Sequence, residues 1–198
     1  MRLHKGFAGL HRGVMLFAGL IALWWLATLT SVPAFLLPSP AAVAIALWQN
    51  AGYLGHHTLI TLTEIVSGMA LGVLLGSVLA LGMTFSPWLQ RWMMPLVITS
   101  QAIPVFALAP LLVLWFGFGM GAKVAMAVLV IFFPVTSAFF DGLRHVTPGY
   151  LDLARTLGAS PAAQLRHVRL LAALPALGSG LRMAAAVAPI GAIIGEWV

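Results

Sequence analysis

Residues 152–175 read DLARTLGASPAAQLRHVRLLAALP, a basic stretch with helix-capping signals in an otherwise strongly apolar chain. Charged residues make up only 7% of the 198 residues, whereas a soluble domain carries about 25%. The stretch nevertheless holds three arginines and a histidine. Its purpose therefore depends on where the apolar remainder of the chain lies.

The composition predicts an all-α polytopic membrane protein. Hydrophobic residues make up 62% of the chain, and the mean hydropathy is +1.05. The net charge of +6 is compatible with nucleic-acid binding. The basic residues, however, are spread between apolar spans and do not line one aromatic-bearing face, so we expect no nucleic-acid partner. Because the chain has no cysteine, disulfides and thiol chemistry are excluded.

We expect about five membrane spans, because apolar runs long enough to cross a bilayer recur along the chain. They cover residues 14–30, about 58–85, 95–119 and about 122–142, and a fifth begins near residue 181 and is still apolar at the last residue.

The expected division is an N-terminal part, residues 1–57, with an anchor span and an interfacial helix, and a transmembrane domain, residues 58–198. A cleaved signal peptide is the alternative for the first span, but no small-x-small cleavage site follows cleanly. Ser39 and Pro40 predict an N-cap and first turn, and the apolar run that follows them is too short to span.

The basic residues predict the orientation of the spans. If the N-terminus is cytoplasmic, only Lys123 of the ten Lys and Arg residues lies outside. Such an excess of cytoplasmic Lys and Arg is the positive-inside pattern, and it places residues 152–175 in the cytoplasm. The nine residues on the expected cytoplasmic side are Arg2, Lys5, Arg12, Arg91, Arg144, Arg155, Arg166, Arg169 and Arg182.

Two features of the spans indicate packing or function. In the second span, Gly68, Gly72 and Gly76 recur every four residues and let another helix approach closely, within the subunit or across a dimer. In the third span, Pro104 and Pro110 each remove a backbone donor and predict a kink or break. Gln101, Pro104 and Pro110 favour a pathway-lining helix as much as a kink for packing.

Two capped helices are predicted in the basic stretch. Thr147 and Pro148 begin the first, which Gly158 ends. Ser160 and Pro161 begin the second, which is expected to close at Pro175. We call residues 147–169 the knob. A loop resting on anionic lipid would explain the charges, but it would not explain two ordered helices, so a protein-docking surface is favoured.

The stretch resembles the EAA loop of the membrane subunits of bacterial ABC importers, whose pattern is Glu-Ala-Ala, three residues, Gly, nine residues, a β-branched residue, one more and Leu-Pro. The positions that fit are Asp152, Ala154, Gly158, Val168 and Leu170. Asp152 replaces Glu, Leu153 replaces the first Ala, and Leu171 stands where the first proline is usual. Three further segments look like the nitrate, sulfonate, taurine and pyrimidine branch of that family, namely LPSP at 37–40, SQAIPVFALAPLLVLWFGFG at 100–119 and FFPVTSAFFDGLR at 132–144.

The resemblance implies a type I permease fold with a coupling loop at residues 143–180. It implies a homodimer or a paired permease subunit, two ABC ATPase subunits and an extracytoplasmic solute-binding protein in the inner membrane. The coupling contact would be formed by Asp152, Ala154, Arg155 and Gly158, and residues from Ala159 to Arg169 would supply the docking helix. From charge alone, we expect Arg155, Arg166 and Arg169 to pair with acidic groups of the ATPase.

ATP hydrolysis is expected in the partner, because the chain lacks the GxxxxGK[ST] motif that cradles phosphates. ATP and Mg would bind there, and this chain is expected to bind no cofactor or metal. Members of the family usually carry one more span, so we expect a missing C-terminal span.

Two acids inside predicted spans, Glu64 and Glu196, are candidates for the translocation path, together with Gln101, Pro104, Pro110 and Trp115. The expected function is translocation of a small polar solute, with a hydroxymethylpyrimidine-type thiamine precursor ahead of taurine, aliphatic sulfonate or nitrate. An ion-coupled secondary transporter is the alternative from another class, but no second half matches the first as an inverted repeat would require.

Overall fold

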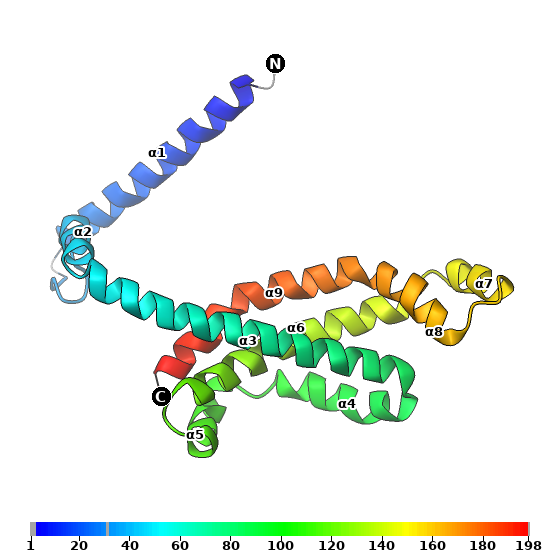
Figure 1. Ribbon diagram of the computed structural model, residues 1–198. Coiled ribbons are helices and arrows are strands. Elements are labelled where there is room, and N and C mark those ends of the chain that lie inside the picture. The colour runs from blue at the N-terminus through cyan, green and yellow to red at the C-terminus, as the bar shows by residue number, and fades with distance from the viewer. Residues whose placement is uncertain (1–2, 31, 198) are drawn as a thin grey trace. The chain divides into compact units, whose positions relative to one another are not determined.

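The computed structural model describes residues 3–30 and 32–197, with side chains from residue 11 onward. Arg2 and the side chain of Lys5, which entered the orientation argument, lie outside the described residues, as does Val198. The described parts consist of helices and connecting turns (Figure 1). The chain divides into two compact units, residues 1–58 and 59–198.

The first unit contains α1 (Leu3–Thr28), α2 (Pro40–Gln49) and the beginning of α3. The part of α1 from His11 to Thr28 is long and apolar enough to cross a membrane. Ser39 caps α2 as predicted, because its Oγ accepts a hydrogen bond from the backbone N–H of Ala42 at 3.2 Å.

The second unit holds the remaining helices. Four helices of the described chain are long and apolar enough to span, or five if a bent pair of helices counts as one span, which agrees with the predicted five. In chain order the elements are α3 (Ala51–Phe85), α4 (Pro87–Ser100), α5 (Val105–Phe116), α6 (Met120–Arg144), α7 (Pro148–Thr156), α8 (Pro161–Gln164), the π-helical turn η1 (Leu165–Arg169) and α9 (Leu170–Glu196).

Helix α6 is the centre of this unit, with α3 and α9 packed along it (Figure 1). A Cβ atom built on Gly68 of α3 would lie 2.5 Å from Cβ of Ala127, and one on Gly191 of α9 would lie 2.9 Å from Cα of Ala127. Glycine therefore allows both backbones to approach α6. The predicted glycine row of the second span thus packs within this chain.

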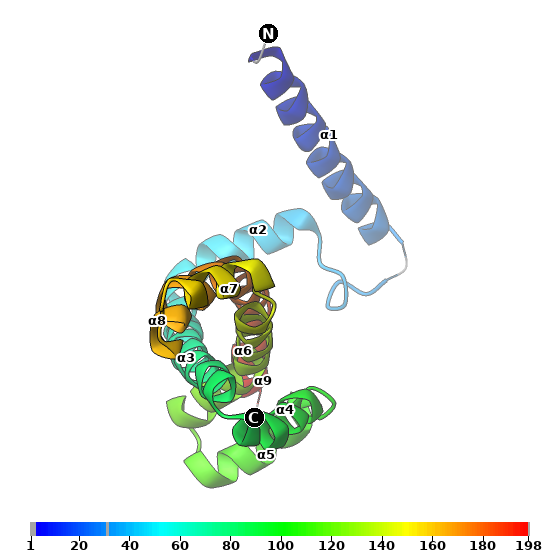
Figure 2. The ribbon, with the colours of Figure 1, turned by 90° about the vertical axis from the view of Figure 1, so that its right-hand side faces the viewer.

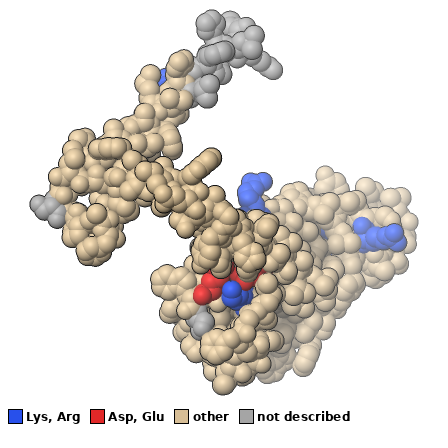
Figure 3. Space-filling model, turned by 60° about the vertical axis from the view of Figure 1, so that its left-hand side comes forward, with Lys and Arg blue, Asp and Glu red and all other residues tan. Residues whose placement is uncertain are grey.

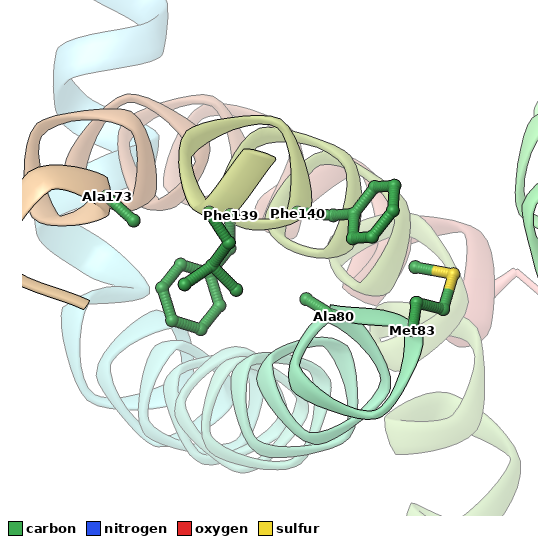
Figure 4. Close-up of a cluster of buried hydrophobic side chains, with 6 residues drawn as sticks. Ala80, Met83, Phe139, Phe140 and Ala173 are labelled. Atoms are coloured by element: carbon green, nitrogen blue, oxygen red, sulfur yellow. The ribbon is translucent and has the colours of Figure 1, made fainter. Parts of the chain in front are cut away.

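A cluster of buried apolar side chains joins the same three helices near the knob. Met83 comes from α3, Phe139 and Phe140 from α6, and Ala173 from α9 (Figure 4). Leu143, which is fully buried, completes the cluster at the end of α6. Seen from this end of the unit, α7 and α8 lie in front of α3 and α6 (Figure 2).

The predicted third span is broken. Its first helix, α4, begins at Pro87 and not at the predicted Pro95, because Ser86 caps it through the N–H of Leu89 at 3.2 Å. The chain then bends by 107° between α4 and α5. Pro104 is the N-cap residue of α5, which confirms the predicted break there. Pro110 stays inside α5 without ending it.

The fifth span begins earlier than predicted. Residues 161–196 form one continuous helical run, so Pro175 does not close a short helix and the span does not start near residue 181. The packing on both sides of Pro175 explains this result. A Cβ on Gly142 of α6 would lie 3.1 Å from Cβ of Ala173 and 2.7 Å from Cβ of Ala176. These contacts with α6 lie on both sides of Pro175. They offset the local loss of a helical hydrogen bond at the proline, so the helix continues past it.

Candidate coupling and translocation sites

The turn between α7 and α8 has the geometry that its glycine predicted. Gly158 has φ +76°, in the left-handed region that favours glycine. Its N–H donates to the carbonyl of Arg155 at 2.9 Å, and the N–H of Ala159 donates to that of Ala154 at 2.9 Å. This pair of bonds is a Schellman motif, which ends a helix and reverses the chain. The cap at Gly158 is therefore confirmed.

The start of α8 is held on both sides of the turn. Ser160 Oγ accepts a hydrogen bond from the N–H of Ala163 at 3.3 Å, as its predicted role as N-cap requires. Gln164 Nε2 donates to the carbonyl of Ala159 at 2.8 Å. At the other end of the knob, Thr147 is the N-cap residue of α7 and Pro148 lies in its first turn, as predicted, although the Thr147 side chain makes no capping bond.

An apolar groove of about 500 Å³ opens between α7 and the start of α9. Leu157 at its edge is 77% exposed. The residues that line the groove are Tyr150, Leu153, Ala154, Leu157, His167, Val168, Leu171 and Ala172.

The three arginines of the knob have different partners. Arg155 pairs with Asp152 at 3.0 Å, and both side chains are mostly exposed. Arg169 is half-buried, and its Nη1 donates to the carbonyl of Leu143 at 3.3 Å, across the base of the knob. Arg166 is exposed and has no hydrogen bond or ion pair to a residue that the structure describes.

Glu64 of α3 is an intramembrane acid, and its side chain is fully buried. It lies beside the end of α6 that is farther from the knob. Lys123 Nζ stands 3.0 Å from its Oε1, and the Lys123 side chain is 26% exposed. Neither carboxylate oxygen has a hydrogen bond of good geometry among the described residues. The ammonium therefore approaches off the hydrogen-bonding directions, and charge attraction holds the pair.

Glu196 joins this polar cluster from a third helix. Its Oε1 accepts a hydrogen bond from Thr61 Oγ1 of α3. A Cβ on Gly195 would lie 2.9 Å from Cα of Lys123, so α9 meets α6 at this point. Acidic and basic side chains lie next to each other on the face shown in Figure 3. The sequence indicated both acids but neither of their partners.

The other path candidates lie on the α4–α5 pair. Gln101 is the C-cap residue of α4, and Pro104, Pro110 and Trp115 follow at the start of α5 and within it. All four are exposed. None has a hydrogen bond or ion pair to the polar cluster of Glu64 in the part of the chain that the structure describes. Across the described residues, no group of three or more His, Asp or Glu is placed to hold a metal ion.

Arg182 was missed as a candidate, because it was expected at the cytoplasmic start of the fifth span. It lies inside α9, exposed, and without a hydrogen bond or ion pair to the described residues. Arg182 becomes a candidate only in the structure, where α9 continues through Pro175 and places this arginine inside the span.

Comparison with known proteins decides the family. Residues 72–198 match the family described as "Binding-protein-dependent transport system inner membrane component". The chain belongs to this family. It is therefore a multi-pass inner-membrane permease of the type I ABC importer fold, and the expected fold class is confirmed.

Three relatives are similar over most of the permease chain. A "Probable ABC transporter permease protein" of Haemophilus influenzae is 52% identical over 93% of this chain and 76% of that protein. The riboflavin transport system permease protein RibX of Chloroflexus aurantiacus is 39% identical, over 90% of this chain and 68% of that one. The formylaminopyrimidine transport permease protein ThiX of Halalkalibacterium halodurans is 36% identical, over 93% and 74%.

Proposed function

We propose that this permease is the translocation subunit of an ATP-driven importer, with its N-terminus and its knob on the cytoplasmic side. The knob carries the proposal. It presents an exposed apolar groove beside a capped glycine turn, whereas an ordinary polar loop needs neither. An exposed apolar patch with a polar rim is typical of a protein-docking site.

The partner at this groove is an ABC ATPase, which binds ATP and Mg and carries out hydrolysis. Two such subunits act on a pair of permease subunits, and an extracytoplasmic binding protein delivers the solute. In this arrangement Asp152, Ala154 and Gly158 shape the docking surface. Arg166, which is exposed and has no hydrogen bond or ion pair among the described residues, would meet an acidic group of the ATPase.

The solute is a nitrogen heterocycle of the thiamine-precursor class. Two similar permeases are named for riboflavin and formylaminopyrimidine transport, and both of those compounds contain planar nitrogen heterocycles. Taurine, aliphatic sulfonate or nitrate is the alternative that the motif resemblance leaves open. The exposed carboxylate of Glu196 favours the heterocycle, because it repels anions and accepts hydrogen bonds from ring and amino N–H groups.

The test is reconstitution of the permease in proteoliposomes with its ATPase and binding protein. ATP hydrolysis is measured with hydroxymethylpyrimidine, formylaminopyrimidine, riboflavin, taurine, an aliphatic sulfonate and nitrate. We expect a pyrimidine to stimulate hydrolysis and to be imported. Stimulation by sulfonates alone would overturn the solute assignment. Uptake that needs an ion gradient but no ATP would overturn the importer and support a secondary transporter.

A further inference from the structure

We propose that Arg182 lies on the aqueous translocation path and binds the solute through hydrogen-bond acceptors of its ring. This inference rests on the proposed function and names the residue that recognises the solute in the membrane. The guanidinium offers five N–H donors in a planar fork and stacks on aromatic faces, so it suits a flat heterocycle with ring nitrogens or carbonyl oxygens.

The register of α9 against α6 places Arg182 deep in the membrane. A Cβ on Gly195 would touch Lys123, whereas a Cβ on Gly180 would lie 2.8 Å from both the carbonyl oxygen of Pro134 and Cβ of Ala138. Arg182 is therefore close to the level of Thr136. Thr136 lies 144 − 136 = 8 residues from Arg144 at the knob end of α6, which is about 12 Å at helical rise. It lies 136 − 123 = 13 residues from Lys123 near the other end of α6, which is about 20 Å.

An arginine at this depth does not face lipid without a large cost. Snorkelling serves side chains near helix ends, and Arg182 is more than two helical turns inside the level of Arg144. Intramembrane arginines accordingly face a water-filled cavity or a partner charge. The choice between these two settings follows from where the acids of the chain lie.

The chain offers almost no carboxylate that could neutralise Arg182. It has four acidic residues, and the first unit, residues 1–58, contains none of them. Glu64 pairs with Lys123, Asp152 pairs with Arg155, and Glu196 accepts from Thr61. Asp141, in the last turn of α6, has no side-chain hydrogen bond or ion pair among the residues that the structure describes. A water-filled path is thus the favoured environment of Arg182.

Two prolines on the same face of α9 support an aqueous environment. Pro175 and Pro189 lie seven residues on either side of Arg182, close to two helical turns each way, and all three are exposed. Each proline lacks an N–H, so the carbonyl four residues earlier, at Leu171 or Ala185, loses its helical donor. In hydrocarbon such carbonyls cost several kcal/mol each, whereas water satisfies them.

The side chains between these residues are small. Ser179 and Ala186 share the face with Arg182, and both are exposed. The opposite side of α9 is the one that packs on α6, through Ala173, Gly180, Ala184, Ala188 and Gly191. The face with Arg182 is therefore not used for packing among the described residues, and its side chains are small.

The first experiment measures accessibility, and it uses the absence of cysteine in this chain. Arg182→Cys is made in the reconstituted complex with ATPase and binding protein and treated with a charged, membrane-impermeant thiol reagent. We expect labelling that formylaminopyrimidine slows in a concentration-dependent way. Met183→Cys, the exposed neighbour turned by about 100° on the helix, is the matched control and should react slowly without protection. Absence of labelling at Arg182→Cys would overturn the aqueous location, and labelling without protection would overturn solute binding.

The second experiment measures transport and ATP hydrolysis. We expect Arg182→Met to lower solute-stimulated import at least tenfold, the effect of removing a hydrogen bond to a charged group, about 1.5–3 kcal/mol. Assembly with the ATPase should be retained, and Arg182→Lys should keep part of the import. Selective loss of sulfonate transport would overturn the heterocycle as the ligand.

Two outcomes separate this inference from its competitors. If Arg182→Asp is rescued by Asp141→Arg, the arginine pairs with a second subunit and the inference is wrong. If the unmodified complex shows no stimulation by any solute, the proposed function fails. The labelling rate of Arg182→Cys compared with Met183→Cys still reports whether this face is aqueous.

Discussion

Glu64 is a carboxylate inside the membrane domain, and its ion pair with Lys123 offsets the cost of burying its charge. Glu64 is fully buried, and the side chain of Lys123, which pairs with it, is 26% exposed. An ion that leaves water without a partner costs several kcal/mol, and an ion pair recovers much of that cost. The stability of the unit therefore depends on both charges being present or both being absent.

This dependence predicts different results for single and double variants. Lys123→Met should lower the free energy of unfolding of the permease in nanodiscs by about 3 kcal/mol, the lower end for a broken buried pair because Lys123 is partly exposed. Combining it with Glu64→Leu should restore most of the loss. Arg91→Met, which removes an exposed charge on α4, should change stability by less than about 0.5 kcal/mol. Equal destabilisation of the single and double variants would show that the two charges do not act as a pair.

The sequence predicted the two acids of this site but not the residues that pair with them. An acidic residue within an apolar run can be recognised from the sequence alone, so Glu64 and Glu196 were predicted as intramembrane candidates. Their partners, Lys123 and Thr61, lie on other helices, and only the packing of α3 and α9 on α6 brings them together. The partner of Arg169 is likewise 26 residues away in sequence, at the end of α6.

At the scale of elements, small residues set how closely the helices approach. Two glycines of α9 provide a comparison within one helix. A Cβ on Gly180 would lie 2.8 Å from α6, whereas one on Gly178 would have nothing within 4 Å. Gly180→Ala should therefore destabilise the unit by about 1–3 kcal/mol through overpacking. Gly178→Ala should be neutral or stabilising by up to about 1 kcal/mol, because alanine favours helix.

Thermal unfolding of both variants in the same nanodiscs is the measurement. A fall in the unfolding temperature for Gly180→Ala alone is the expected result. If both variants fall equally, the close contact between α6 and α9 is not what holds the unit together.

The elements that were predicted well are those with local signals. Ser39, Ser160 and Gly158 act on their own neighbours in sequence, so their caps could be predicted without the fold. The passage of α9 through Pro175 depends on α6, and the π-helical turn of Leu165–Arg169 has no sequence signature that we could use. The predicted boundaries therefore failed where tertiary packing overrides local preference.

At the scale of the whole second unit, one continuous helical run joins the knob to the polar cluster. Residues 161–196 extend over 36 residues, about 54 Å at helical rise. The run begins beside the apolar groove of the knob, passes Arg182 and ends at Glu196. We expect a displacement of the knob by the proposed ATPase to be transmitted along this helix, which also bears the proposed solute contact.

The proposed docking of the knob on an ABC ATPase can be measured by site-specific cross-linking. Leu157→Cys, the only cysteine of its chain, is labelled with a maleimide photo-cross-linker in membranes that contain the ATPase. Phe118→Cys, 87% exposed in the turn before α6, is the control. We expect a photo-adduct with the ATPase from Leu157→Cys and none from Phe118→Cys. An adduct from Phe118→Cys and none from Leu157→Cys would contradict it.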